Sequence, residues 1–266
     1  MVFLRIALVC WLAGAAFLSA RADDILFIGN SFTFADMAPM VMRHGGVPKL
    51  VEEIALAKGK PVATSAVTSG GKDWAWHLAQ PKTEKALGSK TWTWVVLQDL
   101  STRPTRLGNE AQFMKDGETF SDRIARTSPN AGILLFETWA RPAGKFYQGK
   151  PDYGPEQMMD DLHKSYASLR DDLTAKNTGR PVRVALVGTA FARVKTEYPE
   201  IKVDAADEHH ATAEGYYLAA LVIYETIYHE SVKGAPAEFF HGAAIIPSDE
   251  ATKLQGVADE VCGQLK

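Results

Sequence analysis

Short runs of apolar and β-branched residues recur along this chain, separated by stretches of other character. Four runs are strong and a fifth is weaker; they lie at residues 25–28, 94–97, 132–136 and 182–187, with the weaker one at 62–67. Continuous apolar runs of this length are typical of strands that are buried on both faces, as in a parallel sheet. The pattern therefore predicts an α/β fold around a central, mostly parallel five-stranded sheet.

The segments between these runs have patterns that indicate helices. Apolar residues spaced three and four apart form one face of an amphipathic helix; they are Met158, Leu162, Tyr166, Leu169 and Leu173. Residues 39–58 and 109–126 are compatible with helices, Thr212 is a candidate N-cap, and a last helix is expected after Ser248. Strands alternating with helices predict a flavodoxin-like three-layer α/β/α sandwich, in a single domain over residues 23–266.

The first 22 residues are predicted to be a signal peptide. Arg5 gives the segment a positive start, residues 6–18 are apolar, and Ala20-Arg21-Ala22 offers a small-residue cleavage site before Asp23. The apolar stretch is too short for a transmembrane anchor. We therefore expect an exported, periplasmic or extracellular protein without stable membrane insertion.

The composition argues against several classes of partner and site. The 266 residues carry a formal net charge of −3, and no basic block or basic-aromatic stripe is present, which argues against nucleic acid as a partner. Outside the first 22 residues Cys262 is the only cysteine, so no intramolecular disulfide is expected. No Cys/His cluster has the spacing of metal ligands. We predict no metal and no cofactor, and the sequence does not indicate an oligomeric state.

The strongest functional signal is a glycine turn at the end of the first run. Residues 28–33 read Ile-Gly-Asn-Ser-Phe-Thr, so Ser31 leaves the carboxyl end of a buried strand, the edge where catalytic groups collect in open α/β sheets. Far along the chain, Asp207-Glu208-His209-His210 precedes the helix expected after Thr212. Serine, histidine and aspartate are the parts of a hydrolytic triad, in which histidine takes the serine proton and aspartate orients the ring.

These motifs resemble those of the SGNH (GDSL-like) hydrolase superfamily, and the resemblance extends over nearly all of residues 23–266. The family's Gly-Asp/Asn-Ser turn is matched by Gly29-Asn30-Ser31, and its Asp-x-x-His before the terminal helix is matched by Asp207 and His210. The resemblance implies a serine hydrolase with Ser31 as nucleophile, His210 as base and Asp207 as the orienting carboxylate. His209 is the alternative base.

The resemblance also implies an oxyanion hole. The family has a glycine after the second strand; here we favour Gly71 because Trp74 then takes the apolar position three residues on, and Gly70 is the alternative. The family's asparagine after the third strand is replaced by Gln98, which carries the same amide one methylene further out. The backbone N–H groups of Ser31 and Gly71 and the side-chain amide of Gln98 are therefore expected to converge on the developing negative charge.

Other aromatic and histidine side chains have less specific patterns. Trp74, Trp76 and Trp139 are placed near the same sheet edge, and Trp74 or Trp139 is our candidate platform for a sugar ring, with core packing as the alternative. Residues 141–155, rich in Gly, Pro and Tyr, predict a long loop over the strand ends. Surface or packing roles are expected for the remaining histidines, which are His44, His77, His163, His229 and His241.

Taken with the resemblance, these features predict an exported serine esterase that hydrolyses a small-molecule or glycan ester through an acyl-enzyme, with carbohydrate O-acetyl groups favoured. The alternative is a catalytically silent carbohydrate-binding protein with the same fold. A nucleotide-binding protein is disfavoured because no Gly-x-Gly-x-x-Gly follows the first strand. A thiol enzyme is disfavoured because Cys262 lies near the chain end without a partner histidine in its sequence context.

Overall fold

The computed structural model describes residues 22–177 and 179–263, and its centre is a five-stranded parallel sheet. The strand order is β2-β1-β3-β4-β5, with every neighbouring pair parallel. The strands are β1 (Asp23–Gly29), β2 (Val62–Thr68), β3 (Trp94–Leu97), β4 (Gly132–Phe136) and β5 (Val182–Ala185). Each of the five apolar runs therefore forms a strand, as predicted.

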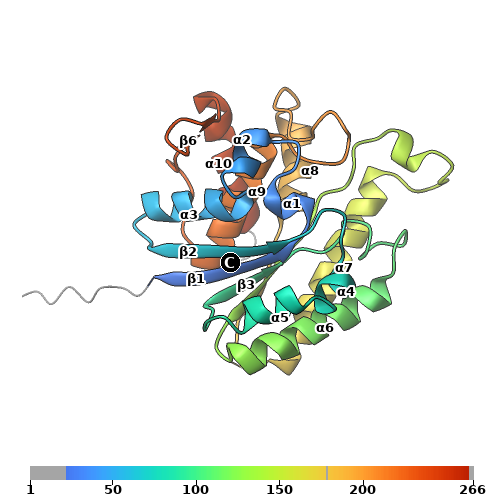
Figure 1. The fold of residues 1–266 in the computed structure, drawn as a ribbon. Helices are drawn as coiled ribbons and strands as arrows, with labels where there is room; N and C mark the ends of the chain where they lie inside the picture. Colours follow the sequence, from blue (N-terminus) through green and yellow to red (C-terminus); the bar gives the residue numbers. More distant parts are fainter. Residues whose placement is uncertain (1–21, 178, 264–266) are drawn as a thin grey trace, which may run out of the picture.

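Helices cover both faces of the sheet and complete the predicted three-layer sandwich (Figure 1). One face carries α1 (Ser31–Phe34), α2 (Pro39–Arg43), α3 (Val47–Ala57), α8 (Val187–Glu197) and α9 (Ala213–Tyr228), and α10 (Ser248–Gly263) packs on α8 and α9. The other face carries α4 (Trp74–Leu78), α5 (Pro81–Leu87), α6 (Glu110–Thr127) and α7 (Pro155–Lys176). A 3-10 turn, η1 (Lys145–Tyr147), and a small antiparallel hairpin of β6 (Glu238–Phe239) and β7 (Ala244–Ile245) complete the described elements.

Burial follows the position of each strand in the sheet. Every residue of β3 and β4 is buried, because both faces of these strands are covered by helices. The edge strand β2 has no fully buried residue, which explains why its apolar run is the weakest. Strand β5 ends at Ala185, two residues before the apolar run does, because Val187 already begins α8.

The helix expected over residues 39–58 is broken into α2 and α3. Gly45 and Gly46 separate the two helices and have φ angles of 109° and 73°. A Cβ on Gly46 would lie 2.6 Å from the carbonyl oxygen of Thr33, so this close approach requires glycine. The break brings α3 against α1, the short helix that carries Ser31.

Polar side chains mark the helix starts that the sequence predicts. Thr212 caps α9, because its hydroxyl oxygen accepts a hydrogen bond from the Gly215 N–H at 3.2 Å. Asn109 caps α6 in the same way, with its side-chain oxygen 2.9 Å from the Gln112 nitrogen. The last helix begins at Ser248, as expected.

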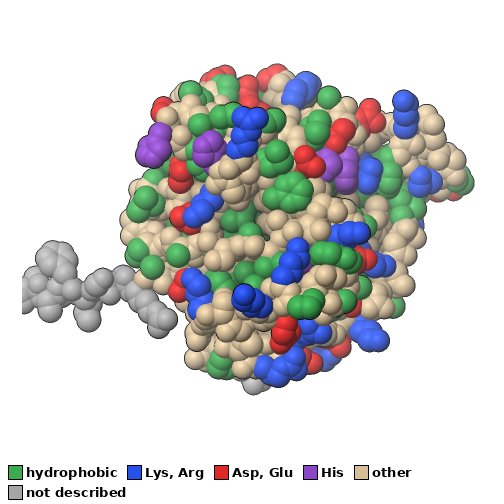
Figure 2. All heavy atoms as spheres, viewed as in Figure 1, with side chains coloured by type: hydrophobic (Ala, Val, Ile, Leu, Met, Phe, Trp, Pro, Cys, Tyr) green, Lys and Arg blue, Asp and Glu red, His purple; other side chains and the backbone are tan. Residues whose placement is uncertain are grey.

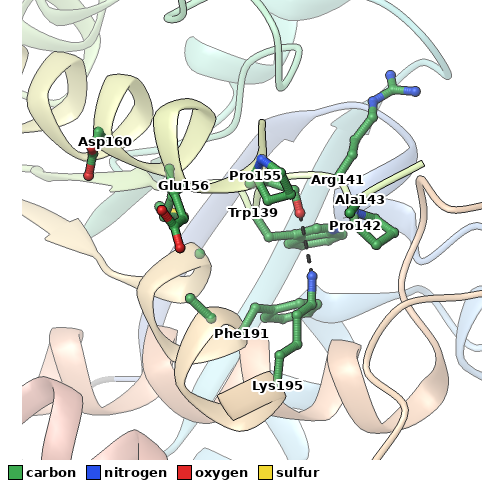
Figure 3. Close-up of a pocket in the computed structure, with 13 residues that line it drawn as sticks. Trp139, Arg141, Pro142, Ala143, Pro155, Glu156, Asp160, Phe191 and Lys195 are labelled. Carbon is green, nitrogen blue, oxygen red and sulfur yellow. Dashed lines mark hydrogen bonds between the residues drawn. The ribbon is translucent and has the colours of Figure 1, made fainter. Parts of the chain in front are cut away.

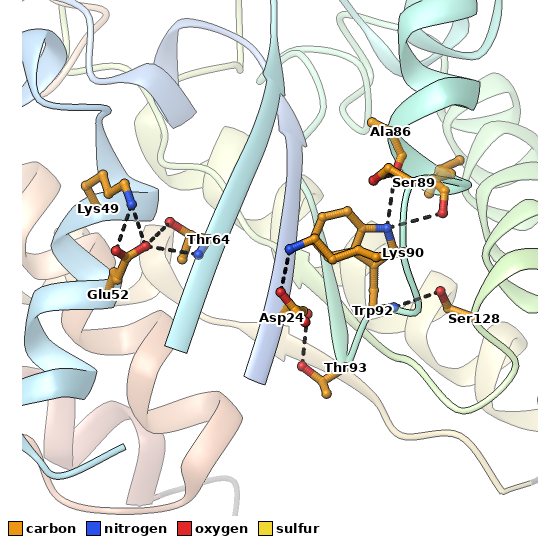
Figure 4. Close-up of polar contacts among 11 residues, drawn as sticks. Asp24, Lys49, Glu52, Thr64, Ala86, Ser89, Lys90, Trp92, Thr93 and Ser128 are labelled. Carbon is orange, nitrogen blue, oxygen red and sulfur yellow. Dashed lines mark hydrogen bonds and ion pairs between the residues drawn. The ribbon is translucent and has the colours of Figure 1, made fainter. Parts of the chain in front are cut away.

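Polar contacts fix strands β1 and β2 in place (Figure 4). A carboxylate oxygen of Glu52 in α3 accepts hydrogen bonds from the backbone N–H and the hydroxyl of Thr64 in β2, at 3.0 and 2.7 Å. Asp24, near the start of β1, forms an ion pair with Lys90 at 2.5 Å. The ion pair anchors the end of β1 that lies opposite Ser31.

Surface charge, the apolar character of the helices and the first residues of the chain relate to the prediction of an exported protein without membrane insertion. Figure 2 shows acidic and basic side chains interspersed on one face of the molecule. Within residues 22–177 and 179–263, no helix combines the length and the apolar character that crossing a membrane requires. The predicted signal peptide lies outside the described residues, apart from residue 22.

Candidate active site

Ser31 lies where β1 passes directly into α1. Asn30 caps this short helix, because its side-chain oxygen accepts a hydrogen bond from the Phe32 backbone N–H at 3.3 Å. Ser31 is only 5 % exposed. Neither its hydroxyl nor its backbone N–H is hydrogen-bonded to another described residue. The hydroxyl is thus available as a nucleophile, and the N–H is available to an oxyanion.

Gln98, directly after β3, braces this turn. Its Oε1 accepts hydrogen bonds from the Asn30 backbone N–H and the Thr33 hydroxyl, both at 2.9 Å, and its Nε2 donates to the Asp99 carbonyl oxygen. A Cβ on Gly29 would lie 2.7 Å from Gln98 Oε1, so the brace also requires glycine there. An oxyanion donor is the role that the sequence favours at this position, and a strand-end residue that satisfies loop backbone is the alternative. Because an NH₂ group has two hydrogens, one is left for an oxyanion, and that role of Gln98 stays a prediction.

The loop after β2 brings Gly70 and Gly71 to the same sheet edge. The Lys72 N–H donates to the Ser69 carbonyl at 3.2 Å, and the Lys72 carbonyl accepts from the Asn30 side-chain amide at 3.0 Å. Gly71 has a φ of 65°, in the left-handed region that favours glycine, whereas Gly70 has a negative φ or extended backbone. Within the described chain neither glycine N–H has an acceptor, so both can reach an oxyanion, and Gly71 stays our prediction.

His77 contributes to the site, although the sequence predicts a surface or packing role. Its ring is fully buried on α4, and its Nε2 donates to the Gly29 carbonyl at 2.9 Å. The same carbonyl accepts the Ser69 N–H at 3.1 Å. Burial lowers the pKa of His77 to about 4, so the ring is neutral near pH 7 and Nε2 carries the proton of this bond. His77 therefore positions the end of β1 just before Ser31.

Asp99 is a second buried polar residue that the sequence analysis does not single out. Its Oδ1 accepts hydrogen bonds from the backbone N–H groups of Trp74 and Leu100, both at 2.8 Å. Burial raises the pKa of Asp99 to about 7. The contact joins the end of β3 to the start of α4. The available sequence signal was an acidic residue directly after Gln98 at a strand end.

The structure brings Asp207 and His210 together in the loop before α9. Oδ2 of Asp207 and Nδ1 of His210 are 2.6 Å apart, and Oδ1 accepts the backbone N–H groups of His209 and His210 at 3.1 and 2.9 Å. Burial would raise the pKa of Asp207, but the hydrogen bonds from His210 and His209 outweigh it and hold the pKa below its ordinary value. A charged carboxylate on Nδ1 leaves Nε2 of His210 to accept a proton.

His209 has different surroundings. Burial, followed by electrostatic interaction with Arg141 and with His210, lowers the pKa of His209 to about 4. Its Nδ1 is buried and has no hydrogen-bond partner among the described residues. Its backbone carbonyl accepts a hydrogen bond from Trp139 Nε1 at 3.3 Å. Of the two rings, only that of His210 is bonded to Asp207, so the geometry favours His210 as the base.

The two halves of the site meet at Phe32. Its ring centroid lies 5.6 Å from that of His210 and 5.0 Å from that of His209, so the histidine loop packs against the residue that follows Ser31. Ser31 and His210, both within the described chain, are not hydrogen-bonded to each other. Such bonds are often long before substrate binds. The three predicted triad residues thus assemble at one sheet edge, and the serine–histidine hydrogen bond stays a prediction.

Neither Trp74 nor Trp139 can serve as the sugar platform suggested by the sequence. Trp74 is fully buried and stacks on Phe113 with centroids 5.0 Å apart. Trp139 lies between Phe32 and Phe191, with centroid separations of 4.1 and 4.3 Å and nearly parallel rings. Because their faces are covered by other rings in the core, the packing alternative is the one that the structure supports.

A cavity of about 480 Å³ opens beside the site, between α7, α8 and the segment after β4 (Figure 3). Trp139 forms part of its wall, and Ser31 is not among its lining residues. Lys195 extends into it, with Nζ 2.7 Å from Asp204.

The predicted loop over residues 141–155 contains η1 and projects at the carboxyl end of the sheet, as Figure 1 shows. Across the described ranges, no group of three or more His, Cys, Asp or Glu side chains is arranged to hold a metal ion.

The chain is similar to known proteins in its structure rather than in its sequence. No protein-family model and no curated protein matches the chain. A DUF4886 family protein from Bacteroides uniformis matches with a TM-score of 0.69 at 16% identity, over 90% of this chain and 94% of that one. A candidate SGNH hydrolase from Slackia heliotrinireducens matches with a TM-score of 0.60 at 24% identity, over 77% and 99% of the two chains. A member of the lipolytic G-D-S-L family from Veillonella parvula matches with a TM-score of 0.55 at 12% identity, over 79% and 100%.

At these identities the similarity concerns the fold. It agrees with a central five-stranded parallel sheet that is flanked by helices. The chain has the fold of the SGNH hydrolases.

Proposed function

We propose that this protein is a serine hydrolase that cleaves carboxylic esters through an acyl-enzyme at Ser31. The observation that carries the proposal is the 2.6 Å hydrogen bond between Asp207 and His210 in a loop that packs on Phe32, next to Ser31. In an SGNH fold, this edge of the sheet is where a nucleophile and its base can meet a substrate. The free hydroxyl and free N–H of Ser31 also support it.

The chemistry follows from these positions. His210 Nε2 takes the proton of Ser31 as Oγ forms a bond to the ester carbonyl carbon. The carbonyl oxygen becomes an oxyanion, which the N–H groups of Ser31 and Gly71 stabilise, with Gln98 as a third candidate donor. The bond to the alcohol oxygen then breaks, and the imidazolium returns the proton to that leaving group. Water deprotonated by His210 attacks the acyl-enzyme, and the carboxylic acid leaves as Ser31 is restored.

Within this proposal, an O-acetyl group on a carbohydrate is the favoured substrate. The predicted export would place the protein where glycans are accessible. Trp76 is the aromatic residue near Gly71 that remains partly exposed, and Lys82 Nζ lies 5.0 Å from the centroid of its ring. A partly exposed indole can stack on a sugar ring, so Trp76 takes over the platform role that Trp74 and Trp139 cannot fill.

The alternative is a carbohydrate-binding protein without turnover, and two measurements separate the two. The esterase releases p-nitrophenol from p-nitrophenyl acetate and is labelled by a fluorophosphonate at Ser31, as found by peptide mass spectrometry. The binding protein does neither but is retained by a glycan. Acetate release from acetylated glycans, compared with neutral synthetic esters, then tests the substrate class. Inhibition by EDTA without inhibition by the phosphonate would contradict the mechanism.

A further inference from the structure

Arg141 is a half-buried cation at the rim of the cavity beside the candidate site. Figure 3 shows that its side chain leaves the segment that carries Trp139 and points away from Lys195. Its Nε is buried without a hydrogen-bond partner, and no other guanidinium nitrogen of Arg141 is bonded or ion-paired within the described chain. Glu156 and Asp160 also line the cavity, on the far side from Arg141 (Figure 3).

A half-buried guanidinium without a hydrogen bond or ion pair is unusual among the arginines of residues 22–177 and 179–263. Seven of them have a guanidinium that is hydrogen-bonded or ion-paired; they are Arg103, Arg106, Arg123, Arg170, Arg180, Arg183 and Arg193. Of the other three, Arg43 and Arg126 are exposed, and water can solvate them. Arg141 is the half-buried arginine of the described chain whose guanidinium makes no hydrogen bond or ion pair, and burying such a group without a hydrogen-bond partner is costly.

Local contacts hold Arg141 in this position. Its guanidinium lies 4.1 Å from the ring centroid of Phe146, a cation–π contact that leaves its N–H edges available. Its backbone carbonyl accepts a hydrogen bond from the Tyr147 hydroxyl at 2.9 Å. Burial lowers the pKa of Arg141, but a guanidinium remains charged in a protein. The result is a fixed positive charge with free donors.

The Arg141 guanidinium lies close to the loop that carries Asp207, His209 and His210. Arg141 follows Trp139 by two residues, and two residues of chain span at most about 7 Å. Trp139 stacks on Phe32, next to Ser31, and donates to the His209 carbonyl. Arg141 interacts electrostatically with both Asp207 and His209.

A half-buried cation beside this loop opposes any step that creates a second positive charge there. During ester cleavage His210 becomes an imidazolium, which a nearby positive charge disfavours. A carboxylate bound to the guanidinium fork would remove this opposition and would supply the missing partner. We propose that Arg141 binds a carboxylate of the substrate, so that preferred substrates are esters with a carboxylate near the scissile bond. This inference rests on the esterase function proposed above.

The test compares charged and neutral esters in the full chain. In one pair, called the acyl pair, the charged ester carries its carboxylate on the acyl half: p-nitrophenyl acetate is the neutral ester and p-nitrophenyl hemisuccinate the charged one. In the other, the alcohol pair, the charged ester carries its carboxylate on the alcohol half: acetylated glucose is neutral and acetylated glucuronic acid is charged. The quantity compared is the ratio of kcat/KM for the charged ester to that for the neutral one. The variants are Arg141→Gln and Arg141→Lys, with Lys145→Gln as the matched control, because Lys145 is an exposed cation on the same loop.

We expect Arg141→Gln to lower the ratio by roughly 10- to 100-fold in one pair, which also shows which half of the ester carries the carboxylate. Arg141→Lys restores only part of the ratio, because lysine keeps the charge but lacks the two-pronged donor. Lys145→Gln leaves the ratio unchanged. An unchanged ratio in Arg141→Gln for both pairs would overturn the inference while leaving the esterase intact.

A second measurement does not depend on turnover. Calorimetry with succinate and with glucuronate should detect binding to the parent protein and a loss of that binding in Arg141→Gln. Absence of any ester hydrolysis by the parent protein would count against the proposed function alone. Equal binding of both anions by the parent and by Arg141→Gln would overturn the role of Arg141.

Discussion

His209 and His210 are neighbours in the chain, but their rings have different surroundings. The ring of His210 is bonded to Asp207, whereas Nδ1 of His209 is buried without a partner among the described residues. We therefore expect His210→Ala to lower kcat for p-nitrophenyl acetate by about 10³- to 10⁴-fold. His209→Ala should lower it less than about 10-fold, since it removes packing and not the base. The reverse order of the two variants would place the base one residue earlier.

Gln98 has a bracing role that can be measured apart from catalysis. Gln98→Ala leaves the Asn30 N–H and the Thr33 hydroxyl without their acceptor, which should lower the free energy of unfolding by about 1–3 kcal/mol. If the amide also donates to the oxyanion, kcat falls about 10²- to 10³-fold. Urea unfolding and steady-state kinetics separate the two effects.

Gln98→Glu is the matched comparison, because it keeps the acceptor and loses the donor. It should not recover the rate, because a carboxylate offers no donor, and it should not recover the stability, because one carboxylate oxygen would face the Asp99 carbonyl oxygen in a buried place. Native stability in Gln98→Ala would contradict the brace, and at least about half the native kcat in both variants would remove Gln98 from the oxyanion hole.

At the residue scale, what the sequence can predict depends on covalent spacing. Asp207 and His210 are three residues apart, so a turn can join them, and the sequence is enough to pair them. The burial of Trp139 depends on Phe32 and Phe191, which come from distant parts of the chain. The bond from His77 to the Gly29 carbonyl also joins residues far apart in sequence. Such contacts depend on the packed fold and leave no local pattern.

Among the elements, the break between α2 and α3 depends on Gly46. Gly46→Ala would place a methyl group against the Thr33 carbonyl in a left-handed backbone conformation. We expect it to lower the free energy of unfolding by about 2 kcal/mol or more beyond the effect of Gly59→Ala. Gly59 is the matched control, because its φ of 74° is similar and its surroundings are open. Equal losses in urea unfolding would contradict the close contact between α1 and the start of α3.

The attachment of α4 to the end of β1 makes stability depend on pH. The pKa of His77 is about 4 in the folded chain, against an ordinary 6.5, so the unfolded chain binds more protons between these values. The contribution of the neutral His77 ring to the free energy of unfolding is complete above about pH 6.5 and is lost as the pH falls toward 4. Asp99, whose pKa is raised to about 7, acts in the opposite direction, and His209 acts like His77.

A variant isolates the contribution of His77 from those of the other groups. His77→Gln keeps a donor for the Gly29 carbonyl and removes the titration. The loss of unfolding free energy between pH 7 and pH 4.5 should be smaller in this variant, by a difference on the order of 2 kcal/mol. Urea unfolding at both pH values measures it. The same pH dependence in both proteins would show that the His77 ring is not held neutral.

The elements that the sequence predicts are those whose pattern is local. All five strands, α6, α7, α9 and α10 follow from apolar runs, spacing and caps. The split at Gly46 was not predictable, because it is set by an approach to Thr33 from another element. The sequence also does not predict α4, α5 and α8. The first two have 5 and 7 residues, too few turns for a periodic pattern to stand out, and the start of α8 lies inside the apolar run that predicts a strand.

For the whole molecule, the parallel sheet gathers residues from distant segments at one edge. Ser31 follows β1, Gly71 follows β2, Gln98 follows β3, and the Asp207–His210 loop packs against Phe32. The strand ends supply the proposed nucleophile and the predicted oxyanion donors. Gln98 and Asp99 after β3 and His77 on α4 hold the turns through hydrogen bonds. This arrangement explains how segments almost 180 residues apart can form one site.

The most direct test of the central claim is the kcat of Ser31→Ala on p-nitrophenyl acetate, with thermal unfolding measured on the same sample. We predict a loss of about 10⁴-fold or more with an unchanged Tm, because the variant removes one hydroxyl that has no hydrogen-bond partner among the described residues. Fluorophosphonate labelling should disappear in parallel. Near-native turnover by Ser31→Ala would contradict the assignment of Ser31 as the nucleophile.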